Sequence, residues 1–345
     1  MSTPAWAEQA TARRRRVVDV MRHGQAELVR SFSAIDAGAA FVDHTWSRSE
    51  GGGGTARVIE GGAVFERGGV NVSAVRGARV PPSLAERHQG TAGQPFFATG
   101  ISLVLHPSNP FVPAFHANFR YFEVGEGESP QLWWFGGGAD LTPAYPVEAD
   151  VRHFHRTLAA WCERFEQADY PAWKATCDAY FTVRHRGEMR GVGGVFFDEL
   201  RPPEAAHASE GAFESDLACV EAGIGAIQPA YLPLIERHRD APYGERERAW
   251  QGLRRGRYVE FNLVYDRGTL FGLQTGGNVE AILMSLPPYA HWAFDHRPEP
   301  GSPEEAALRY YQPREWADAA TPGRAGTRGR CTELDERATK EVETR

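Results

Sequence analysis

Three polar residues at alternate positions are the clearest candidates for a functional site in this sequence: His116, Asn118 and Arg120. They lie in a β-branched and aromatic run, 111–124, whose alternation predicts a strand with all three side chains on one face. A histidine can exchange a proton near neutral pH, and an arginine presents a planar fork to a carboxylate or phosphate. The pattern therefore predicts a site for an anionic ligand with acid and base capacity.

A second predicted strand, 101–105, comes just before this one and is joined to it by the turn cluster Pro-Ser-Asn-Pro at 107–110. The same alternation places Ser102 and His106 together on one face of the second strand. Pairing of the two strands as a hairpin would therefore collect five polar groups on one sheet surface. Phe119 and its odd-numbered neighbours point to the other face, which we expect to be core.

Two carboxylates are further candidates for chemistry. Asp140 follows an aromatic strand and three glycines at 136–138, which let a backbone pass close to a ligand. A cap or turn role is the commoner one for a lone aspartate, so both readings stay open. Asp266 lies at the turn of a second predicted hairpin, formed by 257–265 and 269–274.

Four histidines could bind a metal ion together, but their spacings match no compact metal motif such as HExxH. For any one of them a hydrogen-bonded structural role is commoner than ligation. His185 ends an apolar series at four-residue steps, which predicts that it faces the core side. The four are His106, His116, His155 and His185.

These side chains need a sheet and helices to position them, and the rest of the chain supplies both. Strands and helices are mixed without a regular βαβ order, which favours an α+β fold with a mainly antiparallel sheet covered by helices. We expect a single domain over 1–317 and a charged, disordered tail at 318–345. Helices are predicted at 13–35, 148–167, 169–185, 213–253 and 279–286, and further strands at 132–140, 191–198 and after the glycine-rich turn 51–54.

Composition narrows the class of protein. The chain has 345 residues, of which 42% are hydrophobic, and a net charge of −7, which disfavours a nucleic-acid binder. We find no run of eighteen apolar residues and no apolar signal-peptide segment, so we expect a soluble, cytoplasmic protein without a membrane span. Widely spaced cysteines argue against a zinc ribbon, an iron-sulfur site or a disulfide framework; they are Cys162, Cys177, Cys219 and Cys331.

The glycine-rich segment 51–54 is not a phosphate loop, because no Gly-Lys-Ser/Thr follows it, and the dinucleotide fingerprint is also missing. A flap near a ligand and a plain turn are equally good interpretations of it. Neither a nucleophile elbow nor a flavin or nicotinamide motif is recognisable elsewhere in the sequence.

The sequence resembles the oxygen-dependent coproporphyrinogen-III oxidase family over roughly 42–297. The resemblance implies a flat antiparallel sheet between layers of helices, a homodimer formed through about 258–293, and no organic cofactor. It also implies a reaction in which coproporphyrinogen III and molecular oxygen give protoporphyrinogen IX, carbon dioxide and hydrogen peroxide. The segments that carry it are 51–54 with 61–66 and 69–71, 106–123, 133–143, 184–188 with 191–200, and 257–268 continuing to 288.

The same resemblance assigns roles to single residues. It implies a proton donor at His116 and divalent-metal positions, described for some members, at His106, His116, His155 and His185. The chain departs from the family pattern at Asn278, where an arginine is usual, so one propionate anchor is missing. The implied substrate contacts are Ser102, Asn118, Phe119, Arg120, Gly276, Gly277 and Asn278.

For such a substrate we expect Arg120 to hold a propionate and His116 to transfer a proton. Asp140 and Asp266 are predicted to bind the pyrrole N–H groups or the developing positive charge. Two other classes are alternatives: a metal-dependent hydrolase that uses the four histidines as ligands, and a non-catalytic tetrapyrrole-binding protein.

Overall fold

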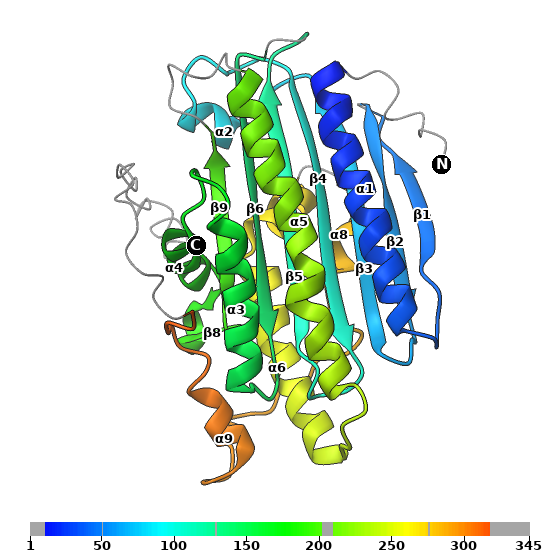
Figure 1. The fold of residues 1–345 in the computed structure, drawn as a ribbon, viewed down its shortest axis with the longest axis vertical. Helices are drawn as coiled ribbons and strands as arrows, with labels where there is room; N and C mark the ends of the chain where they lie inside the picture. Colours follow the sequence, from blue (N-terminus) through cyan, green and yellow to red (C-terminus); the bar gives the residue numbers. More distant parts are fainter. Residues whose placement is uncertain (1–10, 50, 128–129, 202–209, 275–276, 318–345) are drawn as a thin grey trace.

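A seven-stranded antiparallel sheet forms the centre of the molecule in the computed structural model, which describes residues 11–49, 51–127, 130–201, 210–274 and 277–317. The predicted α+β fold with a large antiparallel sheet between helices is confirmed (Figure 1). Neighbouring strands follow the chain closely, so hairpins build most of the sheet. Its order is β1 (Val42–Ser47), β2 (Gly52–Glu60), β3 (Phe65–Gly77), β4 (Phe96–Pro107), β5 (Ala114–Val124), β6 (Leu132–Thr142) and β9 (Gly194–Leu200).

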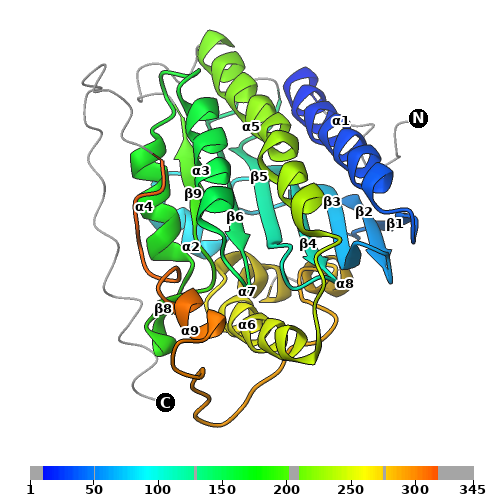
Figure 2. The ribbon, with the colours of Figure 1, turned by 60° about the horizontal axis from the view of Figure 1, so that its bottom comes forward.

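One face of the sheet is covered by three long helices, α1 (Ala12–Ile35), α3 (Glu148–Cys162) and α5 (Glu210–His238), as Figures 1 and 2 show. Odd-numbered residues of β5 point into this layer, where the ring of Phe115 lies 6.0 Å from that of Phe154. Burying such aromatic side chains supplies most of the driving force for folding. This face is therefore the core.

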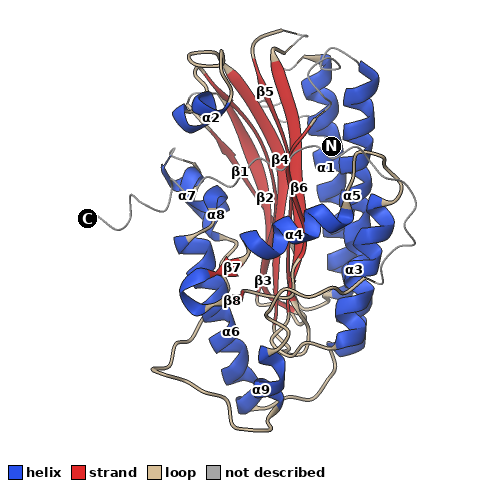
Figure 3. Cartoon of the chain, turned by 90° about the vertical axis from the view of Figure 1, so that its left-hand side faces the viewer, coloured by secondary structure: helices blue, strands red, loops and turns tan. Residues whose placement is uncertain are grey.

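The opposite face is covered only in part, by a second set of helices (Figure 3). Helix α4 (Tyr170–Tyr180) packs against β9 at one edge of the sheet. The two-residue strands β7 (Thr182–Val183) and β8 (Glu188–Met189) follow, with a 3-10 turn at Arg184–Arg186 between them. The helices on this side are α2 (Pro82–Arg87), α6 (Glu245–Val264), α7 (Arg267–Gln274) and α8 (Val279–Leu283), and α9 (Pro303–Leu308) lies near one end of α6.

The predicted hairpin is β4 and β5, and its register confirms the predicted face. Ser102 pairs with Asn118, and Gly100 pairs with Arg120. Residues that pair directly across an antiparallel ladder share a face, so the polar side chains of both strands lie together. That face is the partly covered one.

The second predicted hairpin is wrong, because 257–265 and 269–274 belong to helices α6 and α7. The aromatic and branched residues of this segment favour strands, but in α6 they form a helical stripe that is buried against the sheet side. Tyr258 and Phe261 are buried three residues apart. Asp266 is thus not a hairpin turn residue but the start of a helix, where its side chain accepts the N–H of Thr269.

Smaller differences concern the ends of elements. The glycine-rich turn lies at Gly51 and Gly52, whose φ angles of 103° and 90° favour glycine, and β2 already begins at Gly52. His185 is not on the core side, because α4 ends at Tyr180 and the His185 side chain is 42% exposed. The predicted disordered tail, 318–345, lies outside the described residues, and the single domain over 1–317 stays a prediction.

Helix α5 is long and apolar enough to cross a membrane by length and composition alone. Of its most apolar window, 56% is buried inside the protein, where it packs with α1 and α3 on the sheet. These contacts are those of a core helix. Two prolines inside it, Pro229 and Pro233, lie in the same packed layer.

Candidate active site

A buried carboxylate, Asp140, bonds to two functional groups near the start of β5 on the partly covered face. Asp140 on β6 pairs with His116 on β5, and the distance from His116 Nδ1 to Asp140 Oδ1 is 2.7 Å. Arg190, which directly follows β8, donates to both oxygens of Asp140 at 2.8 and 3.1 Å. Its remaining nitrogen, Nη1, donates to Oδ1 of Asn262 at 2.6 Å. Asp140 and Arg190 are buried, whereas the His116 side chain is 20% exposed.

Asp140 is held as an anion. Burial alone would raise its pKa, but the charge of Arg190 and the hydrogen bond from His116 bring the pKa below its ordinary value. Because an ionised carboxylate only accepts, the hydrogen bond between His116 and Asp140 requires a proton on Nδ1 of His116. The other ring nitrogen, Nε2, is then the atom through which His116 can exchange a proton with a ligand.

Arg120 lies on the same face of β5, four residues beyond His116, and is anchored on two sides. Its guanidinium donates to Asn118 Oδ1 at 3.1 Å and forms an ion pair with Asp198 at 3.0 Å. It also lies 5.6 Å from the centre of the Phe196 ring. One third of the Arg120 side chain is exposed, so an arriving carboxylate can reach this charge and compete with Asp198.

Glycines make the sheet flat around these groups. Arg120 pairs with Gly100 on one side and Gly136 on the other, and Asn118 pairs with Gly138. A Cβ atom at Gly136 would lie 2.9 Å from Arg120 Nε, so this glycine leaves room for the guanidinium. The result is a polar floor with few protruding side chains, which suits a broad, flat ligand. We call this surface of β3–β6 the floor.

The predicted residues fall into two groups. The fold brings Ser102, His106, His116, Asn118 and Arg120 to one face, as predicted, and Asp140 joins them from β6. The Phe119 side chain lies on the opposite face, 5.8 Å from the ring of Trp161 on α3, so it belongs to the core.

The predicted residues at the start of α7 and α8 have structural partners of their own. Asp266 accepts from Tyr180 Oη at 2.9 Å and from both the amide and the hydroxyl of Thr269 at 2.8 Å. Asn278 caps α8 by accepting the amide of Ala281 at 2.9 Å. Gly277 donates its amide to the carbonyl of Gly272, and Gly276 lies outside the described residues.

The four histidines do not fit one metal ion. His155 uses both ring nitrogens, with Tyr170 Oη at 2.8 Å and the Val192 carbonyl at 3.1 Å, and it lies on α3, on the core side. His106 is buried and its Nε2 lies 2.9 Å from the carbonyl of Ser285. Burial lowers the pKa of each of these two histidines to about 3. The described part of the chain holds no cluster of three or more His, Cys, Asp or Glu that could bind a metal.

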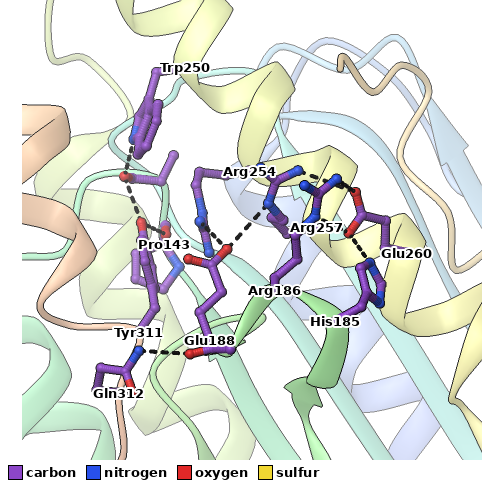
Figure 4. A network of polar contacts seen from close by, with 12 residues as sticks. Pro143, His185, Arg186, Glu188, Trp250, Arg254, Arg257, Glu260, Tyr311 and Gln312 are labelled. Carbon is purple, nitrogen blue, oxygen red and sulfur yellow. Dashed lines mark hydrogen bonds and ion pairs between the residues drawn. The ribbon is translucent and has the colours of Figure 1, made fainter. Parts of the chain in front are cut away.

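His185 belongs instead to a surface network, shown in Figure 4. Its ring contacts Glu260 at 2.7 Å and Tyr265 Oη at 2.6 Å. In the same network Glu188 lies between Arg254 and Arg257 of α6. These pairs fasten β8 to α6 and so fix the segment that carries Arg190. The metal-dependent hydrolase hypothesis depended on the four histidines as ligands, and the fold separates them.

Sequence reasoning missed Arg190 and Asp198. Arg190 precedes the apolar strand β9 and Asp198 lies within it, and a charged residue in or beside such a strand is the only local signal for them. Their partners Asp140 and Arg120 are 50 and 78 residues away in the chain, at distances that spacing arguments do not reach.

The floor and its charged groups define an enzyme site for an anionic ligand, with a proton-exchanging histidine, an ionised carboxylate and an exposed arginine. Comparison with known proteins identifies the family: residues 16–316 match the family described as Coproporphyrinogen III oxidase. A relative from Glycine max, "Oxygen-dependent coproporphyrinogen-III oxidase, chloroplastic", is 48% identical over 321 residues, which cover 90% of this chain and 81% of the relative. The chain belongs to the coproporphyrinogen III oxidase family.

This comparison also corrects the expected cytoplasmic location. The Glycine max relative is named as a chloroplastic enzyme, so its name contradicts that assignment. The absence of an apolar signal segment, on which the expectation rested, does not distinguish a cytoplasmic protein from one that reaches an organelle by another route.

Proposed function

We propose that this chain catalyses the oxygen-dependent oxidative decarboxylation of two propionate side chains of coproporphyrinogen III, giving protoporphyrinogen IX in haem biosynthesis. The observation that carries the proposal is the hydrogen-bonded group His116, Asp140 and Arg190, placed beside Arg120 on the floor. Family membership over most of the chain supports the same reaction.

The stoichiometry shows what the protein must supply. One propionate group, one O₂ and one proton give one vinyl group, one CO₂ and one H₂O₂. The electron pair that oxygen takes up comes from the propionate, as the carboxyl carbon and one β-hydrogen leave. The residues therefore have to orient a propionate and manage a proton, and the reduced macrocycle itself is the electron donor.

The floor has residues for orienting a propionate and for transferring a proton at neighbouring positions. Arg120 binds a propionate by a charge-assisted contact while Asn118 holds the guanidinium in place. His116 offers Nε2 to the reacting group, and Asp140 keeps the tautomer fixed from behind. Arg190 balances the charge of Asp140, so that the carboxylate stays ionised inside the protein.

We also propose that the protein is a homodimer formed through about 258–293. Support comes from apolar side chains that are exposed on and near this segment, since exposed apolar patches mark interaction surfaces. Sedimentation at micromolar concentration should give twice the chain mass; a monomer at that concentration would contradict the proposal. The side chains are Leu263, Val264, Leu273, Val279, Trp292 and Phe294.

Aerobic incubation of the purified protein with coproporphyrinogen III tests the activity. After oxidation of the products, protoporphyrin fluorescence should grow with time and should stop when oxygen is removed. Binding of coproporphyrinogen without any product in air would favour the non-catalytic tetrapyrrole-binding alternative. A matched Arg120→Ala sample reports whether the product comes from this site.

A further inference from the structure

Asn71 on β3 lies in line with the predicted substrate contacts; it belongs to the segment 69–71 that carries the resemblance, but neither the resemblance nor the spacing arguments assigned it a role. It pairs with Ser102 on β4, which pairs in turn with Asn118 on β5, so three polar side chains form one row across the floor. The row continues to Gly138 on β6 and to Ala56 on β2, and these two residues have little or no side chain. Asn71 therefore faces the same space as Asn118.

Two polar atoms on this face of the sheet, one on β1 and one on β3, have no hydrogen-bond partner among the described residues. Oδ1 of Asn71 and Nε1 of Trp46 are both sheltered from water and make no hydrogen bond with any described residue. Trp46 on β1 pairs with Gly54, and its indole ring occupies the place where a side chain at Gly54 would be. Native proteins leave few sheltered polar atoms unpaired, so one acceptor on β3 and one donor on β1, in neighbouring rows of the same face of the sheet, indicate a missing ligand.

The reduced tetrapyrrole has the complementary groups. Its four pyrrole N–H groups are donors and its propionates are acceptors. The two aspartates first predicted to accept pyrrole N–H groups are engaged: Asp140 by Arg190 and His116, and Asp266 by Tyr180 and Thr269. An acceptor for the pyrroles is thus needed elsewhere on the floor.

We propose that Asn71 accepts a pyrrole N–H of the substrate and that Trp46 donates its indole N–H to a propionate. The inference rests on the proposed function and adds a second recognition edge on β1–β3, opposite the edge formed by Arg120 and Asp198. Substrate is then contacted by β1 and β3 as well as by Ser102 on β4 and Asn118 on β5. An uncharged acceptor suits this place, since a further carboxylate would repel the propionates.

Asn71→Leu is the decisive variant, because leucine has a similar shape and no polar atom. Replacing an unpaired polar group by an apolar one of the same shape costs the folded protein little, so the melting temperature should stay the same or rise. The KM for coproporphyrinogen III should rise about tenfold, as expected for one lost hydrogen bond. Asn71→Gln, which keeps a neutral amide acceptor, is the matched control and should bind better than Asn71→Leu.

Oxidised coproporphyrin III separates the two contacts. It has the same four propionates, but its N–H groups are confined to the plane of the aromatic ring and cannot tilt toward Asn71. Its inhibition constant should be unchanged in Asn71→Leu and should rise in Trp46→Phe, which keeps the ring over Gly54 and removes only the N–H. Trp46→Phe should weaken binding of both tetrapyrroles.

Three results would overturn the inference: an unchanged KM in Asn71→Leu, a melting temperature that falls together with the KM effect, or equal weakening of both tetrapyrroles by Asn71→Leu. Each of these outcomes can be distinguished from a failure of the proposed function. Failure of the wild-type protein to form protoporphyrinogen would reject the function itself, whereas an active protein that ignores the loss of Asn71 would reject only this recognition edge.

Discussion

The two faces of the seven-stranded sheet are made from alternate residues of the same strands, yet one is core and the other is the site. On the core face Phe115 and Phe119 pack against α3, and the nearby His155 on α3 bonds to neutral groups. On the floor His116 bonds to an ionised carboxylate and stays accessible. A histidine thus becomes a packing residue or a proton carrier according to its partner, and the strand alternation decides on which side that partner lies.

Removing Arg190 should have the largest effect on the floor, because Asp140 is then left as a buried charge without its cationic partner. Arg190→Met should destabilise the protein by about 3–5 kcal/mol and abolish turnover. Urea unfolding and the aerobic assay measure the two effects. The double variant Arg190→Met with Asp140→Asn removes both charges and should regain much of the stability without regaining activity; a double variant as unstable as the single one would refute the charge argument.

Arg120 tests the propionate contact on the floor. Arg120→Ala should lower kcat/KM for coproporphyrinogen III by roughly 10²-fold, since a charge-assisted hydrogen bond contributes about 1.5–3 kcal/mol. Its stability should change little, because both side chains of the ion pair with Asp198 are one-third exposed. Arg120→Lys keeps the charge but loses the planar fork of the guanidinium, so its kcat/KM should lie between those of the wild type and Arg120→Ala. A lysine variant with a kcat/KM as low as that of the alanine variant would show that geometry matters more than charge.

The core face should reveal itself through the pH dependence of stability. The pKa of His155 is lowered to about 3 by burial, whereas it is about 6.5 in the unfolded chain. The unfolded state therefore binds more protons at intermediate pH, and stability that is fully present above pH 6.5 is lost as the pH falls toward 3. His155→Phe should reduce the change in the free energy of unfolding with pH over this window. Some pH dependence should remain, because burial lowers the pKa of His106 in the same way.

A smaller effect is expected from the flatness of the floor. Gly136→Ala places a methyl group 2.9 Å from Arg120 Nε and should displace the guanidinium. The KM should rise a few-fold, with little change in kcat. Gly187→Ala lies away from the floor at a position with φ of 65°, where strain lowers stability and leaves the KM unchanged. Equal KM values in both variants would show that the floor tolerates side chains.

Sequence reasoning predicted the floor well where a local rule applied. Strand alternation places His116, Asn118 and Arg120 on one face whatever the rest of the chain does, and the turn at 107–110 limits how β4 and β5 can pair. It failed where distant contacts decide. The α6 segment around Tyr258 has strand-like residues, and its helix is stabilised by packing between Arg190 and His106. Arg190 itself has no neighbour in sequence that reveals its role.

The same limit explains the aspartates. Asp140 and Asp266 were equivalent as acids near glycines, and only the tertiary structure shows that one orients His116 while the other caps a helix. A propensity or spacing rule cannot distinguish them, because their donors come from elements far apart in the chain, such as Arg190 and Tyr180.

The central claim is that His116 exchanges a proton with the substrate on the floor while the core histidine does not. The most direct measurement is the initial rate of protoporphyrinogen formation in air by the wild type, His116→Gln and His155→Gln, each normalised to its folded fraction at pH 7. Loss of general acid–base catalysis should slow His116→Gln by about 10²–10⁴-fold, and folded His155→Gln should turn over at nearly the wild-type rate. A His116→Gln enzyme that keeps near-normal turnover would contradict the account.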